Sequence, residues 1–341
     1  MPVGTSTPFE SRRRRRPSAV PGSGHRSWRP AAAGTAFHRL AAVGGPRRWP
    51  AAVAAAVLAV LAFYGLLTLS VSVQDQMPTA GVPLLRAQTN TAVHYAAIAA
   101  ITVVVLLLVR FVEGRPAATI WSVLGRIRWR LLAGCLAAAL VLGLLRMVGL
   151  RPWAADGWVG WTTAVGGAAA ITVFVVFQAA GEEVLFRGLL LQTAGRIMSN
   201  PAPAIVVQAL VWVWFHQPSG PFGFAAVLTT GILLGILTRA TGGLEAAIAW
   251  HIIHNTVGDW LTAATRQPGQ VSTEANAGDM APDRLIPHLV VVTGTITVVY
   301  LAAFLQRAAT RVPESTLQQR EDPDDKPTRR AVEVMADAER W

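Results

Sequence analysis

Runs of about 20 apolar residues recur along the chain and limit its possible folds more than any other feature. A helix needs roughly this length to cross a hydrocarbon core about 30 Å thick. The sequence therefore predicts an all-α, polytopic membrane helical bundle with about eight transmembrane segments. The expected segments are residues 51–73, 91–112, 131–150, 159–180, 202–216, 222–238, 244–263 and 288–306.

Two of these runs, 202–216 and 222–238, are short and are joined by residues 217–221. They fit either two tightly packed spans or a re-entrant hairpin. The first run, 51–73, exceeds the 7–15 apolar residues of a signal peptide. We expect it to remain in the membrane as a signal anchor.

Composition excludes several other classes. Charged residues make up 14% of the chain, against about 25% in soluble domains. The lone cysteine, Cys135, excludes a disulfide scaffold. The net charge of +11 lies mostly in residues 1–48, which contain ten Arg and one Glu. This distribution indicates a basic tail on an apolar body and no nucleic-acid partner.

The same pattern divides the chain into three parts. Residues 1–48 are expected to be a disordered basic N-terminal tail, 49–306 a polytopic membrane domain, and 307–341 a polar C-terminal tail. The Arg12 to Arg16 run would either attract anionic lipid headgroups or only enforce orientation. Residues 264–287 are predicted to form an external loop.

Arginine counts predict the orientation. The stretches after the second, fourth and sixth runs hold eight Arg, and the opposite loops hold four. Both termini are therefore predicted to be cytoplasmic, with the chain in the cell membrane. Because 29 Arg accompany a single Lys, the composition also suggests a GC-rich bacterial genome.

Ionisable residues inside spans are costly and need a reason. Glu183 and Arg187 are four residues apart, on one helical face, and can neutralise each other. Glu182 is rotated by about 100° from Glu183, so it needs a different partner. A carboxylate in an apolar site suits general-base chemistry. The alternative is a charged helix end at the interface, with both glutamates solvated.

Histidines supply the other candidates. His216 ends the run 202–216, one turn after Trp212. His251 and Asn255 share a helical face and could both donate hydrogen bonds to a developing oxyanion. His254 is a neighbour of His251 or a rival candidate. The alternative for the His251 and Asn255 motif is a polar clamp between helices, and the alternative for His216 is an interfacial or packing residue.

Together these motifs resemble the CPBP family of intramembrane proteases, which contains the type II CAAX prenyl endopeptidases and bacterial Abi-type relatives. The resemblance covers about residues 160–262. It implies that Glu182 activates water together with His216, that Glu183 and Arg187 structure the site, and that His251 and Asn255 hold the scissile carbonyl oxygen. The family's second motif usually begins with Phe, where this chain has Trp212.

The resemblance leaves the cofactor open. Family members are commonly described as metalloproteases, and Glu182, His216 and His251 would suit a divalent metal such as zinc. Glutamate-activated water without metal fits equally. The HExxH pattern is absent, because His251 and His254 are three residues apart with no Glu between them.

We therefore expect an intramembrane endopeptidase acting on a bacterial peptide or membrane-protein substrate within the lipid bilayer. The alternative is a non-proteolytic membrane scaffold, immunity or regulatory protein that retains the motifs. One conflict follows from the predicted spans. Glu182 would lie near one membrane surface and His216 near the other, unless the helix bearing Glu182 runs deeper or residues 202–238 form a shallow re-entrant pair.

Overall fold

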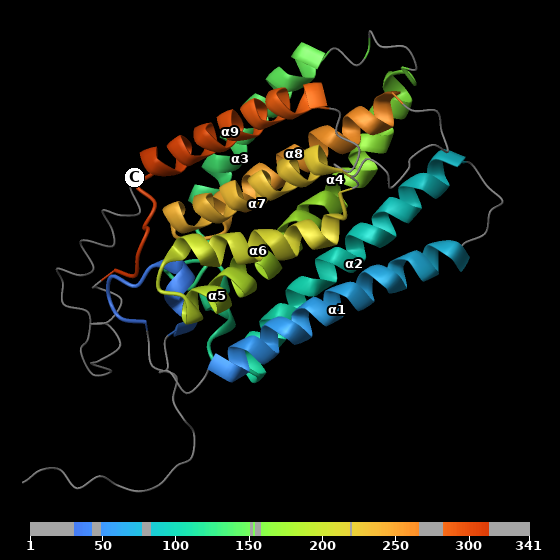
Figure 1. The fold of residues 1–341 in the computed structure, drawn as a ribbon. Helices are drawn as coiled ribbons and strands as arrows, with labels where there is room; N and C mark the ends of the chain where they lie inside the picture. The colour runs from blue at the N-terminus through green and yellow to red at the C-terminus, as the bar shows by residue number, and fades with distance from the viewer. Residues whose placement is uncertain are drawn as a thin grey trace, which may run out of the picture.

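The computed structural model describes residues 31–42, 49–76, 83–150, 153, 158–218, 220–265 and 282–313, and these are almost entirely helical (Figure 1). Within these ranges the only β-type pairings are two isolated bridges. The all-α bundle predicted from the sequence is thus confirmed. The long helices are α1 (Trp49–Gln76), α2 (Pro83–Phe111), α3 (Trp129–Leu150), α4 (Trp161–Glu183), α6 (Pro201–His216), α7 (Pro221–Thr241), α8 (Glu245–Thr265) and α9 (Pro282–Leu305).

Six described helical stretches are long and apolar enough to cross a membrane, so the chain is a multi-pass membrane protein. The two further spans expected from the sequence correspond to α6 and α8. The first has only 16 residues, which is shorter than a full crossing. The second has 21 residues but includes several polar and ionisable side chains. Helix α8 packs inside the bundle, whereas α6 has one face turned inward with Trp212 and another exposed, with Leu210 and Trp214.

The helices pack in a sequence that leaves α4 and α8 at the centre (Figure 1). Helix α2 packs between α1 and α4, and α8 packs between α4 and α3. Helix α9 closes the other side against α3 and α7, and α6 packs on α7. The side chains that α4, α6 and α8 direct toward one another therefore lie away from the lipid.

The helix that bears Glu182 is longer than the sequence predicts. The expected end at residue 180 is wrong, because α4 continues through a π-helical turn (Val184–Leu190) into α5 (Leu191–Ile197). Glu182 lies about 15 residues, or roughly 22 Å of helix, from the end of this run. The charges do not end the helix because Glu183 and Arg187 pair with each other and are fully buried.

This extension removes the conflict over depth. Helix α6 begins at Pro201, after Asn200 accepts a hydrogen bond from the Ala202 backbone amide. It has risen only about 17 Å when it reaches Trp212, and the Trp212 ring meets the Glu182 carboxylate. The two motifs thus lie at the same depth, well inside the bundle.

Part of the predicted N-terminal tail is ordered. Residues 31–42 include a short 3-10 helix (Phe37–Ala42) that packs on α5, with Phe37 and Leu40 buried. Ala36 pairs with Arg311 from the C-terminal segment, and the two segments lie together at one end of the bundle (Figure 1). These apolar side chains explain why a segment assigned to a disordered tail is folded. The Arg12 to Arg16 run, residues 266–281 of the predicted loop, and residues 314–341 lie outside the described residues.

Two buried ion pairs hold the connections at that same end. Before α3, the Arg128 guanidinium donates to both oxygens of Glu245 at 2.9 and 2.7 Å, and to the carbonyls of Thr241 and Ala309. The Arg115 guanidinium pairs with Glu113 at 2.9 Å and also donates to side chains on two other elements. The Arg128–Glu245 pair fixes the start of α8, the helix that carries the His251 motif.

Candidate active site

Glu182 is a buried carboxylate with a hydrogen-bond donor on each oxygen. The Gln178 side-chain amide, one turn earlier on α4, donates to Oε1 at 2.5 Å. The Trp212 indole nitrogen, from α6, donates to Oε2 at 3.0 Å. The two donors come from different helices, so the orientation of the carboxylate depends on the packing of α4 against α6.

Glu183 lies beside it but makes a different set of contacts. Arg187 Nη1 donates to Glu183 Oε1 at 3.0 Å, the pair expected from their four-residue spacing. The same oxygen lies 2.8 Å from His251 Nδ1 of α8. The Arg187 guanidinium carbon also lies 4.4 Å from the centre of the Trp212 ring, within cation–π distance. Glu183 and Arg187 thus connect all three helices of the site.

His251 faces both carboxylates. While Nδ1 contacts Glu183, Nε2 lies 3.9 Å from Glu182 Oε2. That separation is too long for a direct hydrogen bond and is of the size that a water molecule bridges. One turn further along α8, Asn255 Nδ2 donates to Gln178 Oε1 at 3.0 Å. The shared face predicted for His251 and Asn255 is therefore the face turned toward α4.

His216 is connected to the site by its contacts with Trp212, one turn earlier on α6. Its Nδ1 lies 2.9 Å from the Trp212 carbonyl oxygen, and the two rings pack edge to face with centroids 4.4 Å apart. Gln217 follows in a left-handed conformation that ends α6. The ring is partly exposed, so His216 lies between the buried carboxylate and the surroundings.

His254 does not join this group. Its ring stacks on Trp250 at 4.4 Å with an interplanar angle of 17°, and it faces His288 of α9 at 6.5 Å. Trp250 and His254 therefore lie on a neighbouring face of α8, turned toward α9, while His251 is turned toward α4. A spacing of three residues allowed His254 to be a neighbour of His251, but helix packing turns the two rings apart.

Gln178 is a site residue that sequence reasoning missed. Its side chain is buried, donates to Glu182 and accepts from Asn255, so it links two motifs. The available signal was a single amide in the apolar run 159–180, one helical turn before Glu182. The residue carries no charge, and a search for ionisable groups therefore passed over it.

A glycine allows the site to form. A side chain at Gly181 would place its Cβ 2.7 Å from the Ile98 backbone oxygen of α2, closer than such atoms approach. Glycine lets α4 press against α2 just before Glu182. The π-helical turn begins immediately after Glu183, and such turns occur frequently at functional sites.

The side chains do not form a ready metal site. Among the described residues, no group of three or more His, Cys, Asp or Glu side chains is placed to hold a metal ion. Both Glu182 oxygens already accept hydrogen bonds, and His251 Nδ1 contacts Glu183. The residues named for a divalent metal, Glu182, His216 and His251, do not fit one in this arrangement, so we derive no step through a metal.

Fold and site together define a class: a multi-pass helical membrane protein with a buried carboxylate and histidine centre between α4, α6 and α8. Residues 164–257 match the family model described as type II CAAX prenyl endopeptidase Rce1-like. This match confirms the resemblance that the three motifs carry to the CAAX protease family. Comparisons with curated proteins and with solved structures found no match. The family supports an intramembrane endopeptidase of the CAAX type.

Proposed function

We propose that this protein hydrolyses a peptide bond in or beside the membrane with water activated by Glu182 and His216. One observation carries the proposal. A buried glutamate, held by two hydrogen-bond donors, faces a histidine nitrogen 3.9 Å away, inside the segment that matches an endopeptidase family.

Glu182 is the proposed general base. Trp212 and Gln178 hold its oxygens by one donor each, and a carboxylate oxygen has further lone pairs for water. The attacking water would donate a hydrogen bond to the Glu182 carboxylate and would be positioned by His216. It loses a proton to Glu182 as its oxygen forms a bond to the scissile carbonyl carbon.

His251 and Asn255 are proposed to hold the carbonyl oxygen. One amide hydrogen of Asn255 is used by Gln178, which leaves the second for substrate. His251 contacts the Glu183 carboxylate through Nδ1, so donation from Nε2 as well requires the imidazolium form. The oxyanion role thus assigns His251 a protonated ring, with Glu183 and Arg187 keeping it in place.

His216 completes the proton path. Its ring lies against Trp212, at the partly exposed edge of the site. We assign it to positioning water and carrying the proton from Glu182 to the leaving amine, as the tetrahedral intermediate breaks the carbon–nitrogen bond. The products are a new carboxyl terminus and a new amino terminus.

The proposed substrate is a small peptide, a bacteriocin or the terminus of a membrane protein. The arginine bias of the chain favours a bacterial source, where prenylated CAAX proteins are generally lacking. We also propose that the protein lies in the cell membrane with both termini cytoplasmic, as the arginine distribution indicates.

The test compares wild type with Glu182→Gln in native membranes, using mass spectrometry of peptide and membrane-protein termini. Asp75→Asn is the matched control, because this exposed carboxylate lies at the end of α1. Peptidase activity predicts termini that are present with wild type and Asp75→Asn and absent with Glu182→Gln at equal expression. Identical termini in all three, with the cellular phenotype intact, would leave a non-proteolytic scaffold.

A further inference from the structure

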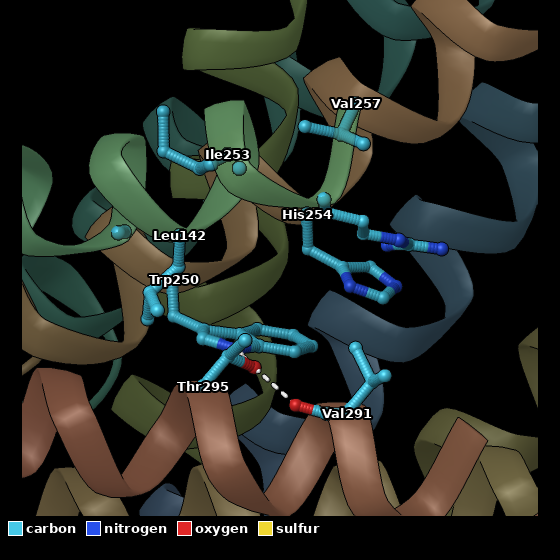
Figure 2. A pocket seen from close by; sticks show the side chains of 10 residues that line it. Leu142, Trp250, Ile253, His254, Val257, Val291 and Thr295 are labelled. Atoms are coloured by element: carbon cyan, nitrogen blue, oxygen red, sulfur yellow. Dashed lines mark hydrogen bonds between the residues drawn. The ribbon is translucent and has the colours of Figure 1, made fainter. Parts of the chain in front are cut away.

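A second cluster of basic side chains lies on the face of α8 that is turned toward α3 and α9, next to the face that carries His251. Arg146 of α3 and His254 of α8 line a cavity of about 30 Å³ between α3, α8 and α9, and His288 of α9 faces His254 at 6.5 Å. Figure 2 shows His254, Trp250 and Thr295 around this space. No acidic residue lines it.

Arg146 has no anionic partner in the part of the chain that the structure describes. The ion pairs found there involve Arg115, Arg128, Arg187 and His251, and none involves Arg146. An arginine in an apolar span carries a large cost unless something compensates its charge. The arrangement therefore calls for an anion supplied from outside the chain.

The cavity has a polar end and an apolar end. Arg146 lies four residues before the end of α3, and His288 lies six residues after the start of α9, so both are near one end of the bundle. Ala139 and Thr295 line the cavity about two turns, or roughly 10 Å, further in. A ligand with a charged head and an apolar chain would match this arrangement, with its head near Arg146 and its chain toward Thr295.

The inner end presents little polarity to a ligand. The Trp250 indole nitrogen donates to Thr295 Oγ1 at 2.8 Å, and this hydroxyl donates to the Val291 carbonyl oxygen (Figure 2). These polar atoms are satisfied by one another. The remaining lining of this part is aliphatic, so it suits a hydrocarbon chain better than a soluble metabolite.

The cavity also borders the lipid-facing surface. Val291, which lines it, is 40% exposed, and neighbouring Val290 and Leu145 are 66% and 62% exposed. An acyl chain could therefore enter sideways from the bilayer while its headgroup stays at the level of Arg146. The positive charge of Arg146, the polar and apolar ends of the cavity and its opening to the bilayer together indicate a single kind of ligand.

We propose that this cleft binds an anionic phospholipid, with its phosphate on Arg146 beside His254 and His288 and an acyl chain against Trp250. The interaction goes beyond the proposed peptidase activity and needs no substrate. Because Trp250 and His251 are consecutive residues of α8, a bound lipid would also stabilise the helix that supplies the candidate active site.

The experiment uses native mass spectrometry of the purified full-length protein, exchanged into phosphatidylglycerol or phosphatidylcholine mixed micelles. We expect wild type to retain one phosphatidylglycerol and to unfold at a higher temperature with it, and phosphatidylcholine to have neither effect. Arg146→Gln should lower retention about tenfold, the loss of one charge-assisted contact. Arg130→Gln, an exposed arginine in the first turn of the same helix, is the matched control.

A second variant covers the case in which Arg146→Gln does not fold. Val291→Phe places a larger side chain at the partly exposed edge of the cleft and should also lower retention, with Arg146 intact. Equal retention of both lipids, or unchanged retention in both variants, would overturn the proposal. Displacement of phosphatidylglycerol by inorganic phosphate alone would assign the cleft to a soluble anion and would overturn it as well.

Discussion

Buried arginine–glutamate pairs occur in two regions of this protein, and they differ in how completely they are bonded. At the end of the bundle, Arg128 and Glu245 satisfy each other and two backbone carbonyls. In the middle, Glu183 Oε2 and the Nε and Nη2 atoms of Arg187 are buried with no hydrogen-bond partner. A second carboxylate, Glu182, lies next to this pair.

This difference in hydrogen bonding distinguishes charged residues that stabilise the fold from charged residues that take part in function. A fully bonded buried pair fixes its segments, and removing one partner leaves an uncompensated charge. Unused polar atoms in a buried site are uncommon and need an explanation. Here they surround the Glu182 carboxylate and the His251 ring, where a substrate or water would supply the missing partners. Four predictions test this contrast, from the largest expected effect to the smallest.

Glu182→Gln should cause the largest loss. The amide cannot accept a proton, so we expect kcat to fall by about 10³-fold or more, while the unfolding temperature stays close to that of wild type. The measurement is cleavage of the substrate identified from native membranes, with thermal unfolding of the same preparation. A variant that unfolds much earlier than wild type would place Glu182 with the structural charges instead.

Arg128→Gln should show the opposite pattern. It leaves Glu245 buried without its cation, which costs about 3–5 kcal/mol of unfolding free energy. Activity per folded molecule should be retained, because Arg128 lies at the end of the bundle. Denaturant unfolding in detergent measures the loss, and Arg130→Gln, exposed two residues later, should be nearly neutral. Equal stability of the two variants would contradict a structural role for the pair.

Trp212→Phe should have an intermediate effect. It restores the aromatic residue usual in the family and keeps the packing, but it removes the indole donor to Glu182. A hydrogen bond to a charged group contributes about 1.5–3 kcal/mol, so we expect kcat to fall roughly tenfold or more with KM little changed. Trp214→Phe, on the exposed side of α6, is the control. Wild-type kinetics in Trp212→Phe would show that the bond does not position the carboxylate.

Much of this arrangement could be predicted from the sequence. Apolar length located each of the eight long helices, because a bilayer requires long uninterrupted runs, but it missed the starts of α2 and α9 and the continuation of α4. Helical spacing correctly paired Glu183 with Arg187 and put His251 and Asn255 on one face. Both signals are local, since they depend on the chain within one or two turns.

What the sequence missed depends on contacts between helices. The position of Gln178 between Glu182 and Asn255 requires α4 and α8 to meet in one particular register. The orientation of His254 toward α9 depends on Trp250 packing against that helix. The continuation of α4 beyond residue 180 depends on burial of charged side chains, and hydropathy alone counts them as breaks.

The last prediction concerns a polar group that is poorly bonded although it lies at the well-bonded end. His38 is buried in the 3-10 helix on α5, outside the spans, and neither ring nitrogen makes a well-formed hydrogen bond. Burial lowers the pKa of His38 below its usual 6.5, and nearby arginines act in the same direction, while the Ser199 backbone has a smaller opposite effect. His38 therefore binds a proton more readily when residues 31–42 are released from α5 than when they pack on it. The packing of this segment is thus most stable above pH 6.5 and weakens as the pH falls.

Hydrogen exchange of residues 31–42, from above pH 6.5 to about pH 5, measures this effect, which should be the smallest of the four. Exchange, corrected for its intrinsic pH dependence, should increase toward acid in wild type and become independent of pH in His38→Leu. Arg39→Gln, which loses a hydrogen bond to the Gly195 carbonyl, should increase exchange at every pH and keep a dependence on pH, with a smaller slope because Arg39 also lowers the pKa of His38. An unchanged slope in His38→Leu would show that a buried, poorly bonded side chain at this end does not respond to protonation. Only the Glu182 site would then show a functional consequence of incompletely bonded buried polar groups.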